Sequence, residues 1–217
     1  MEVYVSKQFL LVIVIVLGLL GGTLVLTKKT SDKTTGDTGS TSATTSNNRS
    51  GNLSSKVTLT EFGDFQCPAC KSYFPIVKQV KEEYKDKIIF EFKHFPLVQI
   101  HPNAFVASRA AEAAGKQGKF FEYHDLLYGN QDSWAQEQSP NSYFEEFAKQ
   151  LGLNVDQFKK DMISESVAST INADAKLAQS IGANSTPTFA INGKKIDNPK
   201  SVEEFKKVID EALKTSN

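Results

Sequence analysis

The chain has 217 residues, and its 25 lysines and arginines balance its 25 aspartates and glutamates. Because there is no basic excess, the composition does not point to nucleic acid as a partner. The length and an apolar fraction of 40% allow one medium-sized domain with its own core, together with accessory segments. Two cysteines in a chain of this size indicate neither a disulfide scaffold nor a metal cluster.

An uncharged and mostly apolar run extends from Phe9 to Leu26, after a short tail at residues 1–8. As a helix rising about 1.5 Å per residue it would be about 27 Å long, close to the roughly 30 Å of a bilayer's hydrocarbon core. The run is longer than the apolar region of an ordinary signal peptide, and no convincing cleavage motif follows it. We therefore expect residues 9–27 to form an uncleaved transmembrane anchor rather than a removed signal peptide.

The composition changes at residues 28–54 to threonine, serine, glycine, asparagine and aspartate. Because this segment has almost no large apolar side chain, it cannot bury enough surface to offset its ordering entropy. The sequence therefore predicts a flexible, disordered linker between the membrane span and a folded domain at residues 55–217.

Both cysteines lie in one C-x-x-C motif, Cys67-Pro68-Ala69-Cys70, at a junction between two patterns. The preceding residues Val57–Phe62 are β-branched and alternating, which predicts a strand. The following residues carry apolar side chains three and four positions apart, which predicts a helix from Pro68 to about Tyr84. Cys67 would then cap this helix, with Pro68 at the first helical position, where a missing N–H costs nothing. Free backbone N–H groups and the helix dipole would stabilise a thiolate at Cys67, and the thiolate is the reactive form of cysteine.

Two other interpretations of the C-x-x-C motif are weaker. A zinc site normally needs four ligands, and the chain has no third cysteine. We expect no metal site, since the three histidines are scattered and lack paired ligand spacing: His94, His101 and His124. A purely structural disulfide between residues three positions apart would close almost no loop and would add little stability. The motif therefore favours a redox-active pair.

The rest of the chain predicts a second strand, a helical region and a return to strands. Alternating apolar residues predict the second strand at residues 88–95. Helices are expected between residues 101 and 181, at 103–114, 120–128, 139–151, 154–162 and 165–181. The only tryptophan, Trp134, falls in a polar loop there and is either an aromatic of a substrate groove or a packing anchor. The C-terminal part predicts two strands joined by an Asn-Gly turn and then a capped helix, at residues 188–191, 194–196 and from 201 onward.

Two segments resemble a known family. Glu61–Cys70 (EFGDFQCPAC), followed by a helix that carries Pro75, is similar to the active-site segment of thioredoxin-fold oxidoreductases, and among these to DsbA-like thiol-disulfide interchange proteins. Gly182–Phe189 (GANSTPTF) resembles the family's second signature, a loop whose proline is cis and faces the disulfide. The resemblance extends from Ser55 to the C-terminus. It implies an α/β (α+β) thioredoxin fold with an inserted helical subdomain at about residues 101–181.

The resemblance also implies roles for five residues. Cys67 would be the exposed nucleophile, and Cys70 would resolve the mixed disulfide. Glu61 would be a buried acid behind the disulfide that helps to move the Cys70 proton. The strand pattern independently places this carboxylate on an apolar face, although a surface glutamate on an edge strand is the alternative. Thr186 and cis-Pro187 would offer backbone pairing to an extended substrate.

The sequence as a whole predicts a membrane-tethered, single-pass enzyme whose catalytic domain is extracytoplasmic, where disulfides persist. The resemblance implies a monomeric oxidase without a cofactor, which introduces disulfides into secreted proteins and is reoxidised by a membrane quinone-linked partner. A disulfide reductase is the alternative, because Ala69 stands where some relatives carry a histidine that further stabilises the thiolate. A peptide-binding holdase is a weaker alternative, since it leaves the paired cysteines unexplained.

Overall fold

The structure is a computed structural model that describes residues 44–216. The predicted transmembrane anchor at residues 9–27 and most of the predicted linker lie outside the described residues. Among the helices of residues 44–216, none combines the length and the apolar character needed to cross a membrane.

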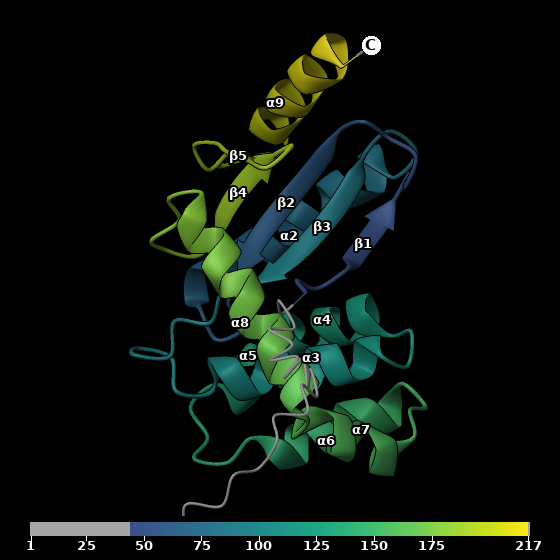
Figure 1. The fold of residues 1–217 in the computed structure, drawn as a ribbon, viewed down its shortest axis with the longest axis vertical. Helices are drawn as coiled ribbons and strands as arrows, with labels where there is room; N and C mark the ends of the chain where they lie inside the picture. Colours follow the sequence, from purple (N-terminus) through teal and green to yellow (C-terminus); the bar gives the residue numbers. More distant parts are fainter. Residues whose placement is uncertain (1–43, 217) are drawn as a thin grey trace, which may run out of the picture. The chain divides into compact units, whose positions relative to one another are not determined.

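A mixed five-stranded sheet forms the centre of the described domain (Figure 1). Its strand order is β1-β3-β2-β4-β5. The parallel pair β2–β3 lies in the middle, and every other neighbouring pair is antiparallel. The strands are β1 (Asn48–Gly51), β2 (Thr58–Gly63), β3 (Ile89–His94), β4 (Thr188–Ile191) and β5 (Lys194–Lys195).

Helices cover both faces of this sheet, and a further group lies at one end of it (Figure 1). On one face, α2 connects β2 to β3 and packs against α9. On the other face, α8 packs against β3. The helices are α2 (Pro68–Tyr84), α3 (Ala104–Gly115), α4 (Phe120–Gly129), α5 (Gln131–Trp134), α6 (Asn141–Gln150), α7 (Val155–Met162), α8 (Glu165–Ser180) and α9 (Val202–Thr215).

The alternation of side chains along the strands produces two apolar layers. Leu59 of β2 and Phe92 of β3 are fully buried in the larger core, which α2, α9 and the helical subdomain share. Phe62 points to the opposite face and packs in a smaller core beneath α8. Glu61 has the parity of Leu59, so its carboxyl group lies on the α2 side, as the strand pattern predicted.

The last residues of the predicted linker are ordered, and this expectation was wrong for them. Residues 48–51 form β1 and pair with the outer side of β3. Just before this strand, the backbone N–H and the hydroxyl of Ser46 donate to the two carboxylate oxygens of Asp174, at 2.9 and 2.6 Å. The folded domain therefore begins before residue 55, because polar residues that cannot build a core of their own complete the edge of an existing sheet.

The helical subdomain consists of α3 to α7, inserted between β3 and α8. It includes the short helix α5, which the sequence analysis had treated as a polar loop. Trp134, at the end of this helix, is fully buried, and its Nε1–H donates to the carbonyl of Leu127 at 2.9 Å. Its ring meets that of Phe144 edge to face, with centroids 5.4 Å apart. Of the two interpretations of Trp134, the packing anchor is therefore the correct one.

Candidate active site

The two cysteines lie at the start of α2, where the chain leaves the central strand β2. Cys67 is the N-cap residue, with extended φ and ψ of −70° and 123°, and Pro68 occupies the first helical turn. Both cysteines are free thiols and both are buried, with 6% of Cys67 and none of Cys70 exposed. The strand–turn–helix arrangement predicted from the sequence is therefore confirmed.

The pKa values of the two thiols are shifted in opposite directions. A hydrogen bond from the Cys70 thiol lowers the pKa of Cys67 from 9.0 to about 5, although burial opposes this shift. Hydrogen bonds from the backbone N–H groups of Ala69 and Cys70 lower this pKa further. Burial raises the pKa of Cys70 well above 9.0, and its hydrogen bond to Cys67 and the negative charges of Cys67 and Glu61 add to this effect. At neutral pH, Cys67 is therefore a thiolate and Cys70 a thiol.

Glu61 lies on β2 behind the thiols and is 2% exposed. Burial raises its pKa from 4.5 to about 8, and the positive charge of Lys81 on α2 opposes this shift only in part. The carboxyl group is therefore mostly protonated at neutral pH and titrates close to it. Such a group is suited to exchange a proton with a neighbouring thiol.

A network of polar side chains fixes the loop between β2 and Cys67. The carboxylate of the fully buried Asp64 accepts the backbone N–H groups of Gln66 (2.8 Å) and Leu97 (2.9 Å), and it contacts His101 Nδ1 at 2.7 Å. From α5, Gln131 Nε2 donates to the carbonyl groups of Phe65 and Cys67, at 2.7 and 3.0 Å. The helical subdomain therefore helps to hold the reactive cysteine in place.

These supporting residues were not predicted from the sequence. Asp64 carried one usable signal, because it is an acidic residue at the turn between an apolar strand and the C-x-x-C motif. Gln131 carried none, since a glutamine 64 positions from Cys67 is brought to it only by the tertiary fold.

The second signature, Thr186-Pro187, lies beside the first, and their peptide bond is cis, as predicted. The carbonyl oxygen of Thr186 is 3.4 Å from the Cys67 sulfur. Asn198 Nδ2 donates to the carbonyl of Pro187 at 2.7 Å and supports the loop from the far side. The structure therefore brings together Cys67, Cys70, Thr186 and Pro187 from two segments that are more than 110 residues apart in the sequence.

A groove of about 490 Å³ lies beside the cysteines, between α2 and the helical subdomain. An ion pair between Lys71 of α2 and Asp132 of α5, at 2.5 Å, lies along this groove. The groove lining is Gln66, Pro68, Lys71, Ser72, Gln131, Asp132, Ala135 and Gln136. Within residues 44–216, no cluster of three or more histidine, cysteine or acidic side chains is arranged to hold a metal ion.

The model of a protein family described as thioredoxin matches residues 43–211. The chain belongs to this family. Among solved thioredoxin-like structures, oxidised BdbD from Bacillus subtilis has a TM-score of 0.67 at 27% identity, with 76% of this chain and 92% of BdbD covered. Wolbachia pipientis alpha-DsbA1, at 22% identity, has the same fold, with a TM-score of 0.68 over 77% of this chain and 91% of that one.

Two curated relatives are similar to the same domain. The Bacillus cereus protein named "Probable disulfide bond formation protein D" is 34% identical over 173 residues, which are 76% of this chain and 77% of that protein. The "Na(+)/H(+) antiporter NhaA 1" of Mycobacterium sp. (strain KMS) is 35% identical over 153 residues, which are 69% of this chain. The chain spans about a quarter of the antiporter's length, since 24% of it is covered. The resemblance to DsbA-like proteins is confirmed by these comparisons.

Proposed function

We propose that the protein is a membrane-tethered thiol–disulfide oxidoreductase that oxidises the thiols of extracytoplasmic protein substrates. The observation that carries this proposal is the opposite acidity of the two sulfur atoms, with the pKa of Cys67 lowered to about 5 and that of Cys70 raised. A sulfur that is stable as a thiolate is a good leaving group, and a reduced form stabilised in this way makes the corresponding disulfide oxidising.

The reaction begins with the Cys67–Cys70 disulfide. A substrate thiolate attacks the Cys67 sulfur, so that a substrate–Cys67 disulfide forms and the Cys67–Cys70 bond breaks. Cys70 leaves as a thiolate and takes the proton of Glu61, because burial disfavours a charge on Cys70. A second substrate thiolate then attacks the substrate sulfur of the mixed disulfide, and Cys67 leaves as a thiolate. The substrate loses two electrons, and the enzyme gains them.

Thr186 and Pro187 form the substrate-binding edge in this proposal. The carbonyl of Thr186 lies 3.4 Å from the Cys67 sulfur, so a peptide attached to that sulfur passes beside this backbone. An extended peptide pairs with such an edge through main-chain hydrogen bonds. Proline at position 187 presents no N–H there and leaves the sulfur free of a competing donor.

The cellular setting follows from the sequence. The apolar run at residues 9–27 anchors the chain in the cell membrane as a single span, and the domain works as a monomer outside the reducing cytosol. A membrane quinone-linked partner removes the two electrons after each turnover and restores the Cys67–Cys70 disulfide. Neither step requires a bound cofactor in this chain.

The reduction potential of the Cys67–Cys70 pair, measured in glutathione buffers, tests the direction of the reaction. We expect a value closer to the roughly −120 mV of a strong oxidant such as DsbA than to the roughly −270 mV of thioredoxin. The purified protein should also reoxidise a reduced, unfolded substrate protein, and Cys67→Ala should abolish this activity. A potential near that of thioredoxin would establish the reductase alternative, and full activity of Cys67→Ala would refute thiol–disulfide exchange altogether.

A further inference from the structure

Behind the thiols, Glu61 does not face protein atoms on every side. It lines a small cavity of about 10 Å³ together with side chains of α2 and α4. This volume is at the lower limit for one water molecule, which needs roughly 10–15 Å³ and two to four polar partners. The polar side chains of the lining supply such partners: Glu61, Lys78, Lys81, His124, Asp125 and Tyr128.

His124 on α4 is the most unusual of these side chains. It is 2% exposed, and among residues 44–216 its Nε2 atom has no hydrogen-bond partner although it is buried. The ring is held by aromatic neighbours, including Tyr128 with centroids 4.9 Å apart and Phe65 at 5.6 Å. A buried polar atom without a partner is costly, so an unpaired ring nitrogen beside a protonated carboxyl group calls for an explanation.

The other ring nitrogen of His124 is held by a partly exposed carboxylate. His124 Nδ1 contacts Asp125 Oδ1 at 3.0 Å, and Asp125 Oδ2 accepts a hydrogen bond from Lys78 Nζ at 2.8 Å. Its hydrogen bond to His124 and the Lys78 charge lower the pKa of Asp125 to about 2, although burial opposes this shift. Because Asp125 is ionised, it accepts the hydrogen of Nδ1, and Nε2 is left as the basic nitrogen.

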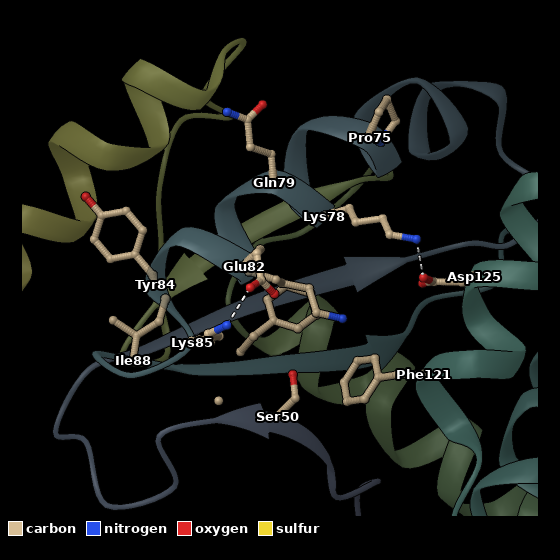
Figure 2. A pocket seen from close by; sticks show the side chains of 13 residues that line it. Ser50, Pro75, Lys78, Gln79, Glu82, Tyr84, Lys85, Ile88, Phe121 and Asp125 are labelled. Atoms are coloured by element: carbon tan, nitrogen blue, oxygen red, sulfur yellow. Dashed lines mark hydrogen bonds and ion pairs between the residues drawn. The ribbon is translucent and has the colours of Figure 1, made fainter.

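Asp125 and Lys78 also line an open groove of about 710 Å³ (Figure 2). In Figure 2, Lys78 of α2 reaches across to Asp125 of α4 at one side of this groove. Lys81 lines both the groove and the small cavity, and its Nζ lies over the ring of Phe121 at 3.8 Å. The small cavity and the groove therefore share a wall, and His124 and Asp125 lie between Glu61 and solvent.

We propose that His124 carries protons between Glu61 and this groove, with Asp125 as the outer acceptor and one water in the cavity as the inner link. The inference rests on the proposed function, in which Glu61 exchanges a proton with Cys70. When Glu61 must lose its proton, the proton passes through the water to Nε2, and Nδ1 passes its own proton to Asp125 and then to solvent. In the opposite half-reaction a proton enters through Asp125 and returns to Glu61. No electron or co-reactant is needed for either transfer.

The charged and titratable groups around this path fit it. Burial lowers the pKa of His124 to about 4, and Lys81 and His94 add to this effect, so the ring is neutral at rest and does not retain a proton that it passes on. Burial raises the pKa of Tyr128, so this residue keeps its proton and does not compete. Lys78 and Lys81 line both spaces as well. Burial lowers the pKa of Lys81, so this lysine is an alternative carrier that the experiment has to separate from His124.

The test is a double-mutant cycle on the rate of disulfide exchange between the reduced full-length protein and glutathione disulfide. Proton transfer by a side chain at the reacting group contributes about 10²–10⁴-fold to a rate. Because His124 acts through Glu61 and not directly on the thiols, we expect His124→Phe to have a smaller effect and to slow exchange about tenfold. In a Glu61→Gln background the same substitution should change the rate less than about twofold, because two residues in one path are not additive. The reduction potential should stay unchanged, since the relay affects the rate alone.

His94→Phe is the matched control, because His94 is equally buried among the same aromatic rings but does not line the cavity. This variant should not slow exchange, because it leaves the path intact and removes one of the effects that lower the pKa of His124. If His124→Phe does not fold, Asp125→Leu tests the same path at a half-buried position and should show the same dependence on Glu61.

Four results would overturn the relay. The first is an unchanged rate in His124→Phe, and the second is equal slowing with and without Glu61, which would show a structural role alone. The third is a slowing of exchange that requires Glu61 in Lys81→Met but not in His124→Phe, which would make the lysine the carrier. The fourth is an unchanged rate in Glu61→Gln, which would refute the role of Glu61 in the proposed function itself. Slow exchange in Glu61→Gln without an effect at position 124 would remove the relay and leave that role intact.

Discussion

Acidification of the reduced protein should lower its stability, because the Cys67 thiolate is favoured only in the folded state. The pKa of Cys67 is about 5 in the fold, against an ordinary 9.0 that we take for the unfolded chain. A group whose pKa is lowered by folding stabilises the fold fully above its unfolded pKa, and the stabilisation is lost as the pH falls through the folded value. For Cys67 this window extends from about pH 9 down to about pH 5.

The size of the effect follows from the two pKa values. Four units correspond to about 5 kcal/mol above pH 9, at 1.36 kcal/mol per unit. At pH 7 the contribution is about 3 kcal/mol, and at pH 5 less than about 0.5 kcal/mol remains. The pH 7 value corresponds to a reduction potential about 60 mV higher than that of the same fold with an ordinary thiol, since 30 mV equals about 1.4 kcal/mol.

Two measurements check this prediction. Ultraviolet thiolate absorbance of the reduced protein should titrate with a midpoint near pH 5, and Cys67→Ala should remove that transition. Urea unfolding should show the reduced protein losing about 2 kcal/mol between pH 7 and pH 5 beyond the loss seen in Cys67→Ala, which shares every other titrating group. A midpoint near 9, or identical pH dependence in the two proteins, would refute the reasoning.

Three further predictions concern the site and its support. Cys70→Ala should accumulate mixed disulfides with a reduced substrate protein on non-reducing gels, and these adducts should vanish when Cys67 is also replaced. Adducts from Cys67→Ala and not from Cys70→Ala would reverse the assignment of the two sulfurs. Asp174→Ala should lower the free energy of unfolding, measured in urea, by about 3 kcal/mol, because it leaves buried donors unpaired. The control Glu165→Ala, at an exposed position on the same helix, should change this free energy little. Gly63→Ala should cost about 1–3 kcal/mol, since a Cβ there would lie 2.5 Å from a phenylalanine ring of β3; an unchanged midpoint would mean that the ring moves aside freely.

The main elements of the fold could be predicted from local patterns. Helix α2 begins at Pro68 and ends at Tyr84, as expected, because its start depends on the proline and its length on an apolar stripe. The strand β1 could not be predicted, since its four residues Asn48–Gly51 contain no large apolar side chain. Their order comes from pairing with β3 and from the carboxylate of Asp174, more than 120 residues away. No local pattern carries that information.

The sequence by itself determined the reactive pair, the strand–turn–helix that holds it and the segment with the cis proline. The pair and the strand–turn–helix depend on residues that are neighbours in the chain, so spacing and composition are enough to reveal them. The cis proline was expected from the family resemblance of residues 182–189. Only the tertiary structure decided how far the two pKa values differ. The pKa of Cys67 depends first on its hydrogen bond from Cys70, and the pKa of Cys70 depends first on burial. It also brought His124 and Asp125 to the cavity behind Glu61. Desolvation and proximity arise when distant segments pack together, so no single stretch of the chain predicts them.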